Sequence, residues 1–146
     1  MITSWTQEYD PEKEEMTGMY FYISLNLDNF QISSILSLYD SLNIKEIPDD
    51  SFIRGWPMGF DGQTYIFETA DQTDYFFRTY WSPSVTDTTQ EAAIISNFIE
   101  EASRLANATK TWEEFIRLVP YKCYSNGSVI ACVYTEEEYK KMQKEE

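Results

Sequence analysis

The sequence predicts an α+β fold, because segments with the two-residue period of a strand and segments with helical spacing of apolar residues occur along the same 146-residue chain. The alternation of apolar and polar residues over 19–27 is typical of a half-buried strand in an antiparallel sheet. Hydrophobic residues make up 42% of the chain and aromatic residues 16%, which suffices for one core. We therefore predict a single antiparallel sheet of about five strands, packed by about two to three helices and followed by a short C-terminal helix.

The polarity pattern also divides the chain into two regions. Residues 1–18 are polar and lack a clear period, so we expect a loosely held N-terminal arm. Residues 19–146 contain no repeat and no linker, and we expect them to form a single α+β domain. The expected strands of this domain are 19–27, 63–69, 74–81, 121–125 and 128–134.

Capping signals and apolar spacing predict the helices. The three expected helices are 30–42, 88–107 and 111–119. Thr88 with Glu91 has the pattern of a capping box, and Thr111 with Glu114 repeats it before the third helix. The segment that starts at Thr135 is expected to be a solvated C-terminal helix.

A central hairpin is predicted around two turns. Asp61-Gly62 suits a two-residue turn that leads into strand 63–69. A second turn near residue 71 would set Phe67 opposite Phe76. Both faces of the hairpin then carry aromatic side chains, and the pattern does not determine which face is buried.

Charge restricts the classes of partner. Eleven Lys and Arg residues against 25 Asp and Glu residues give a formal charge of −14. This charge repels nucleic acid and anionic lipid, and no apolar run reaches the length of a membrane span, so we expect neither nucleic-acid binding nor membrane insertion. The expected partner is another protein, with a basic surface. Acidic pairs such as Asp49 with Asp50 lack the spacing of a calcium loop and are interpreted as solvated surface.

The sequence contains no histidine. Histidine is the commonest general base and a usual zinc ligand, and it completes most serine and cysteine nucleophile arrangements. We therefore expect no catalytic residue, no metal site and no cofactor.

Bulky residues in a turn-rich stretch are the candidates for contact with a partner. Gly, Pro and Asp interrupt this stretch, and large apolar side chains in such a setting can anchor a protein or stack on a sugar ring. The candidate binding residues are Trp56, Met58, Phe60, Asp61, Tyr80 and Trp81. The alternative interpretation is that the aromatic side chains close the end of the core.

The two cysteines lie in the two arms of the C-terminal hairpin, and the turn position decides whether they can bond. A turn centred on Asn126-Gly127 places the sulfurs on a diagonal that is too long for bridging. A turn centred on Gly127-Ser128 sets Cys123 opposite Cys132 at a non-hydrogen-bonded position, where a cross-strand disulfide fits. We favour the disulfide, which would indicate a periplasm or cell surface; the alternative, two buried free thiols, would fit a cytoplasmic protein.

Several short stretches together resemble small exported proteins of bacteria. They are IRGW at 53–56, GFDG at 59–62, YWSP at 80–83 and the hairpin with two cysteines at the C-terminal end. The resemblance covers residues 52–134 and implies an extracytoplasmic setting without implying an activity.

The leading functional hypothesis is a non-enzymatic protein-binding module, such as an immunity-type inhibitor of a basic toxin or effector. The first alternative is a cell-envelope module that binds a saccharide or peptide through its aromatic residues. The second is a hydrolase that uses two carboxylates.

Overall fold

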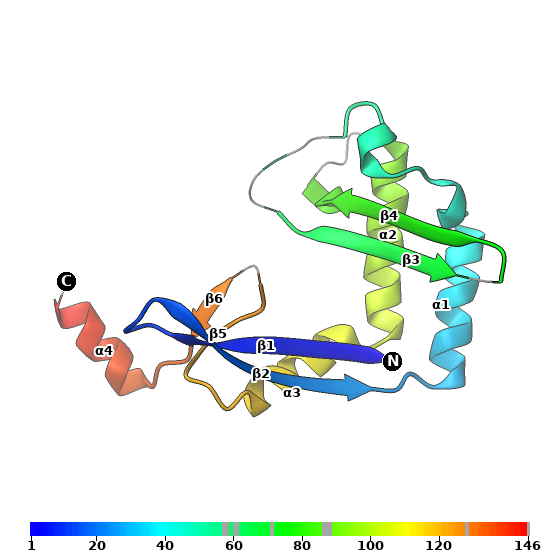
Figure 1. Cartoon of the computed structure of the whole chain (residues 1–146). Coiled ribbons are helices and arrows are strands. Elements are labelled where there is room, and N and C mark those ends of the chain that lie inside the picture. Colours follow the sequence, from blue (N-terminus) through cyan, green and yellow to red (C-terminus); the bar gives the residue numbers. More distant parts are fainter. Residues whose placement is uncertain (57–58, 60–61, 71, 86–88, 128, 146) are drawn as a thin grey trace. The chain divides into compact units, whose positions relative to one another are not determined.

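Six strands and four α-helices form the described part of the chain, which comprises residues 1–56, 59, 62–70, 72–85, 89–127 and 129–145 of the computed structural model (Figure 1). The strands are β1 (Ile2–Asp10), β2 (Glu15–Leu25), β3 (Thr64–Ala70), β4 (Tyr75–Trp81), β5 (Cys123–Ser125) and β6 (Ile130–Cys132). The helices are α1 (Asn29–Ser41), α2 (Gln90–Leu105), α3 (Ala108–Leu118) and α4 (Glu136–Glu145). The α+β class expected from the sequence is confirmed.

The strands form two antiparallel sheets, whereas the sequence analysis predicted one. The larger sheet has the order β2-β1-β5-β6. Within the described residues, β3 and β4 pair only with each other. The prediction of a single five-stranded sheet was wrong because apolar alternation identifies a strand without identifying its neighbour.

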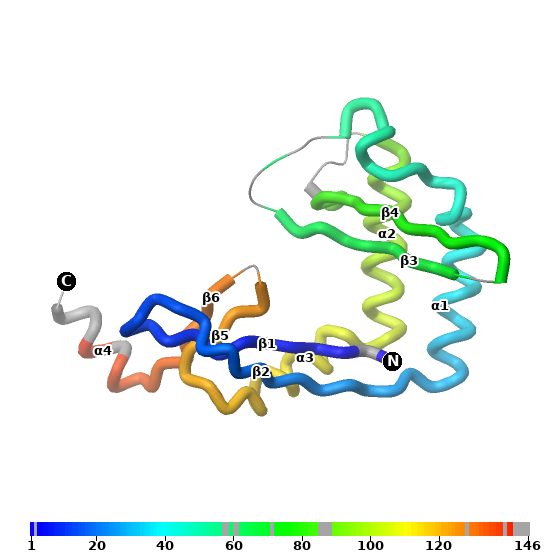
Figure 2. The backbone as a smooth tube through the Cα atoms, in the orientation of Figure 1, coloured from blue at the N-terminus to red at the C-terminus, as the bar shows by residue number. Residues whose placement is uncertain are grey.

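The chain divides into two compact units, and each is described by itself. Unit 1 consists of Met1–Leu27 and Ala108–Glu146, and unit 2 consists of Asp28–Asn107. Unit 2 is therefore inserted in the sequence between β2 and α3. The tube in Figure 2 can be followed through unit 2 from α1 to β3, β4 and α2.

One face of the larger sheet packs against α3 in unit 1. The ring of Phe21 in β2 stacks on the ring of Phe115 in α3, with 5.4 Å between the centroids. Phe115 is fully buried, as is Thr6 of β1. Beside the start of α4, Glu138 accepts a hydrogen bond from the Thr135 amide (2.9 Å) and forms an ion pair with Lys122 (2.6 Å).

Strand β1 takes the place of the loosely held arm expected over residues 1–18. It pairs with β2 along most of its length and with β5 through Gln7 and Glu8. The sequence pattern did not indicate this strand because a polar residue lies on its buried face and an aromatic residue on its exposed face. Thr6 is buried, while Trp5 on the opposite face is 45% exposed. A polar residue on the buried face removes the apolar alternation that marks a strand.

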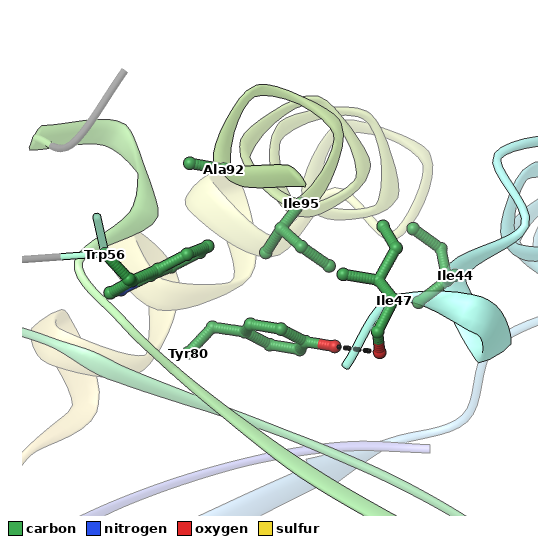
Figure 3. Packing of buried hydrophobic residues seen from close by; sticks show 6 residues of the cluster. All are labelled: Ile44, Ile47, Trp56, Tyr80, Ala92 and Ile95. Carbon is green, nitrogen blue, oxygen red and sulfur yellow. Dashed lines mark hydrogen bonds between the residues drawn. The ribbon is translucent and has the colours of Figure 1, made fainter. Parts of the chain in front are cut away.

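The core of unit 2 lies where the hairpin of β3 and β4 packs on the helices. Six buried residues form its centre, and Figure 3 shows their side chains converging: Ile44, Ile47, Trp56, Tyr80, Ala92 and Ile95. The partly buried residues around them include Tyr39 of α1, Phe67 of β3 and Phe98 of α2. Phe67 contacts both Tyr80 and Phe98, with ring centroids 5.2 and 5.3 Å apart.

The register of the hairpin differs from the expected one. Phe67 lies opposite Arg78, and Phe76 lies opposite Thr69. The shift is an even number of residues, so the side chains that share a face are the same as predicted. The face that carries Phe67 and Tyr80 is the one against the helices. The predicted turn at Asp61-Gly62 includes Asp61, which lies outside the described residues.

Two predicted helix starts also differ. Thr88 lies outside the described residues, and the N-cap of α2 is Thr89, whose hydroxyl accepts a hydrogen bond from the Ala92 amide at 3.1 Å. Helix α3 begins at Ala108 rather than Thr111, directly after Asn107, whose φ is 53°. A residue in the left-handed region ends one helix and lets the next begin at once, so Thr111 is an interior residue of α3.

Candidate functional site

Two of the predicted binding residues belong to the core of unit 2. Trp56 is 7% exposed and Tyr80 is fully buried. The indole N–H of Trp56 donates to the Trp81 carbonyl oxygen (2.9 Å), and the Tyr80 hydroxyl donates to the Ile47 carbonyl oxygen (3.1 Å; Figure 3). Burial raises the pKa of the Tyr80 hydroxyl to about 12. Both side chains hold the fold together and are not on a surface where a partner could contact them.

Trp81 is partly buried beneath the loop that precedes β3. A Cβ atom added to Gly59 or Gly62 would overlap the Trp81 indole ring. The ring therefore requires glycine at both positions. Met58, Phe60 and Asp61 lie outside the described residues, so their contact role stays a prediction.

The outer edge of β4 is closed by Asp49 and Asp50, which sequence analysis interpreted as solvated surface. The amide and the hydroxyl of Thr79 both donate to Asp49 Oδ2 at 2.8 Å. The Trp81 amide donates to Asp50 Oδ2 at 2.7 Å. Arg78 further donates to the Phe77 carbonyl oxygen at 3.3 Å. Side chains thus occupy much of the backbone edge that another strand would need.

The electrostatics of Asp49 follow from these contacts. Burial raises the pKa of its carboxyl group, but hydrogen bonds from Ser51 and from the amide and hydroxyl of Thr79 outweigh burial and lower the pKa to about 2. The ionised carboxylate is therefore the form that closes the edge.

The outer edge of β3 is open. The Ser82 amide donates to the Gln63 carbonyl oxygen at 2.8 Å, so these two residues form a hydrogen-bonded pair. Hydrogen-bonded and non-hydrogen-bonded pairs alternate along an antiparallel ladder, and this contact therefore fixes which residues of β3 bond to β4. The alternate residues of β3 direct their N–H and C=O groups away from β4: Thr64, Ile66, Glu68 and Ala70. Within the described part of the chain, no hydrogen bond reaches these backbone groups.

A groove of about 420 Å³ runs along this open edge. Its lining residues come from α1, from β3, from α2 and from the turn after α1: Ile35, Leu36, Tyr39, Asp40, Lys45, Ile66, Phe67, Glu68, Thr69 and Phe98. Four of them are consecutive in β3, whereas a groove over one face of a strand would be lined by every second residue. The groove is therefore a channel between the strand edge and α1.

Exposed apolar side chains and acidic side chains surround the groove. Leu36 is 58% exposed and Ile66 is 59% exposed. Asp40 contributes an exposed carboxylate from α1, and Lys45 lies 3.9 Å from Asp74. The Glu68 side chain lies on the hairpin face opposite Phe67, where its carboxylate accepts a hydrogen bond from the Tyr75 hydroxyl at 2.9 Å. The sequence signal that could have indicated the groove is in α1, where more apolar residues occur than a single buried stripe needs.

Unit 1 carries a second exposed surface, which we call the aromatic face. It is the side of the larger sheet opposite α3, and its exposed aromatic residues are Trp5, Tyr20 and Tyr22. The Trp5 and Tyr20 rings lie 6.2 Å apart. The side chains beside them, Thr3 and Ser24, are uncharged and joined by a 2.9 Å hydrogen bond.

The expected disulfide is present between Cys123 and Cys132. The two residues lie opposite each other, as the turn at Gly127-Ser128 predicts. The Val133 amide donates to the Lys122 carbonyl oxygen at 2.8 Å, which places the cysteines at the neighbouring non-hydrogen-bonded position. Gly127 has φ of 91°, and Ser128 lies outside the described residues.

Two kinds of feature are absent from the described residues. These residues contain no group of three or more Cys, Asp or Glu side chains arranged to hold a metal ion. No helix among them combines the length and apolar character that a membrane crossing requires. Comparison with protein families, with curated proteins and with solved structures found no match to this chain.

Proposed function

We propose that the protein is a non-enzymatic protein-binding module that inhibits a basic partner, in the manner of an immunity protein that neutralises a toxin. The observation that carries the proposal is the groove between β3 and α1, where apolar side chains such as Leu36 and Ile66 remain exposed beside an open strand edge. Contiguous exposed apolar residues with a polar rim are typical of protein-interaction sites.

The charge of the chain supports a basic partner. Its formal charge of −14 attracts a cationic protein over distances beyond direct contact, and Asp40 places negative charge at the groove itself. Association with such a partner would be fast at low ionic strength and slower as salt is added.

We also propose an extracytoplasmic setting for this function. The disulfide between Cys123 and Cys132 supports it, because structural disulfides persist in oxidising compartments.

The test is capture of the products of the genes that adjoin this one, each produced separately and measured for binding by calorimetry. We expect one basic product to bind, and Leu36→Glu to weaken that binding about tenfold by placing charge in the apolar groove. Tyr22→Ser on the aromatic face is the matched control and should bind as the unaltered protein does. Binding by none of these products, or equal binding by the Leu36→Glu variant, would contradict the proposal.

A second candidate function is recognition of a neutral saccharide, which the aromatic face of unit 1 favours. Exposed Trp and Tyr rings beside hydroxyl side chains can stack on sugar rings and hydrogen-bond to them. This surface replaces Trp56 and Tyr80, which are buried. Titration with a panel of neutral oligosaccharides should change the tryptophan fluorescence of the protein but not that of a Trp5→Ala variant. An unchanged spectrum with every oligosaccharide would eliminate this candidate.

A further inference from the structure

We propose that the open edge of β3 binds an extended segment of the partner as a third strand of the β3–β4 sheet, with apolar side chains in the groove and Lys or Arg side chains attracted by Asp40 on α1 and by Glu68 on the outer face of β3. This inference rests on the proposed protein-binding function and specifies how the partner is recognised. Addition of a strand to a sheet edge derives affinity from backbone hydrogen bonds and specificity from alternate side chains.

The backbone supplies the first argument. Thr64, Ile66, Glu68 and Ala70 each direct an N–H and a C=O away from β4. A segment that pairs with these four residues would satisfy groups that in the described residues have no protein partner. The edge of β4 offers no equivalent row, because Asp49 and Asp50 accept the amides of Thr79 and Trp81.

The helices supply the second argument. Figure 1 shows that α1 and α2 continue past the outer edge of β3. On α1, Ile32 is 40% exposed and Leu36 is 58% exposed, and Leu36 lines the groove. A third strand beside β3 would cover this part of the helices in the way that β3 and β4 cover the core. Every second side chain of the bound segment would point into the groove.

Charge supplies the third argument and selects the chemistry of the segment. Asp40 is at the α1 side of the groove, and Glu68 is on the opposite face of β3, where it also accepts a hydrogen bond from the Tyr75 hydroxyl. The cation of the groove, Lys45, has Asp74 nearby. Carboxylates on both sides of the strand edge favour a segment with basic residues and repel one with acidic residues. The bound segment therefore alternates apolar residues with basic or neutral ones.

The probe is a synthetic seven-residue peptide of alternating Val and Lys, offered to the full-length protein and followed by calorimetry and by amide NMR shifts. We expect saturable binding with shifts concentrated at residues 64–70 of β3 and 35–40 of α1. A second peptide with N-methyl groups on alternate amides, placed on the side that faces β3, should bind about tenfold more weakly because its backbone cannot donate. N-methyl groups on the other amides should have little effect.

Protein variants separate strand addition from general attraction between opposite charges. Asp40→Lys changes an exposed side chain of the groove, and a cation near the C-terminus of α1 suits the helix dipole. This variant should bind the Lys peptide about tenfold more weakly and gain affinity for the analogue with Glu in place of Lys. Glu113→Lys makes the same charge change on the exposed surface of α3 and should leave both affinities near their original values.

Three results would overturn the proposal. The first is equal binding of the N-methylated and unmodified peptides, and the second is NMR shifts located outside β3 and α1. The third is a dimer, detected by sedimentation, that dissociates when Ile66→Pro removes an outward amide, because the edge would then be occupied by a second copy of the chain. A partner captured in the gene-product test that binds Asp40→Lys and Ile66→Pro normally would leave the protein-binding function intact and refute strand addition alone.

Discussion

Asp49 has the sequence context of a solvated carboxylate, but in the structure it holds two segments of the chain together. Its two oxygens accept hydrogen bonds from Ser51 on one side and from Thr79 on the other. These bonds favour the ionised form, so the folded protein holds the pKa of Asp49 at about 2, below the ordinary aspartate value of 3.8. A group whose pKa is lower in the folded state stabilises the protein above its unfolded pKa and loses that contribution as the pH falls.

We therefore predict that part of the acid sensitivity of folding comes from Asp49. The free energy of unfolding should decrease as the pH falls from 3.8 towards 2. Asp49→Asn should flatten this decrease and should lower stability at neutral pH by about 1 kcal/mol, because a neutral acceptor makes weaker hydrogen bonds. Urea unfolding across the pH range measures both effects. Glu113→Gln, an exposed change on α3, should reproduce neither.

At Gly62, neighbouring side chains leave no room for a side chain larger than hydrogen. A Cβ atom there would overlap the Trp81 ring and the Ser82 hydroxyl. We predict that Gly62→Ala destabilises the protein by about 1–3 kcal/mol, the usual cost of overpacking. Thermal unfolding measures the loss, and a double variant with Trp81→Leu should recover part of it. An undiminished melting temperature for Gly62→Ala would show that Trp81 can move aside without cost.

At the scale of the element, the C-terminal hairpin was the most predictable part of the chain. The sequence left two turn positions open, and the one centred on Gly127-Ser128 gave the observed pairing of Cys123 with Cys132, because turn chemistry fixes register over so short a hairpin. Longer hairpins are less constrained. The register of β3 and β4 depends on a loop between them and was mispredicted, whereas the sharing of faces followed from alternation alone.

The disulfide has a predictable energetic role. It links residues separated by nine positions, so its loss should lower stability by about 2 kcal/mol, the low end of the usual range for a short loop. The double variant Cys123→Ser and Cys132→Ser, compared with the unaltered protein by denaturant unfolding, measures this. The unaltered protein treated with reductant should have the same stability as the double variant. A much larger loss of stability in the double variant would mean that the serines also disturb the packing at position 123.

The open edge of β3 could not have been predicted from sequence. Its alternating side chains predicted a strand, but whether a strand lies at the edge of a sheet depends on which other strands lie beside it. Likewise, the pair Asp49 and Asp50 has the composition of a solvated turn, and only the fold brings both carboxylates to the backbone of β4. The candidate site therefore consists of residues whose roles come from distant segments.

At the scale of the whole molecule, the two units were not distinguishable by composition. The junctions at Leu27–Asp28 and Asn107–Ala108 have no Gly- or Pro-rich linker, because a helix starts directly at each: Asp28 caps α1, and α3 begins at Ala108. Inside unit 2, the side-chain amide of Gln31 donates to the Leu105 carbonyl oxygen at 3.0 Å. This hydrogen bond joins the first turn of α1, where the unit begins, to the last residue of α2, close to where the unit ends.

We predict that residues 28–107 fold when produced alone. Every residue of the core cluster around Tyr80 lies within this segment, so the fragment loses none of its buried contacts. Circular dichroism should show helix and a cooperative thermal transition. The matched control is the fragment 28–90, which lacks α2 and with it Ile95, and which should be unfolded. A non-cooperative transition for residues 28–107 would mean that unit 2 requires unit 1 for stability.

The carboxylates that close the edge of β4 also limit how many molecules can join through this sheet. A sheet with two available edges can recruit copies without end, which is the geometry of a growing fibril. Here Asp49 and Asp50 accept two of the outward amides of β4, so two copies of the chain that paired through β3 would present carboxylate-capped edges to any further strand. These two side chains therefore allow the edge of β3 to stay exposed without making the β3–β4 sheet a seed for polymerisation.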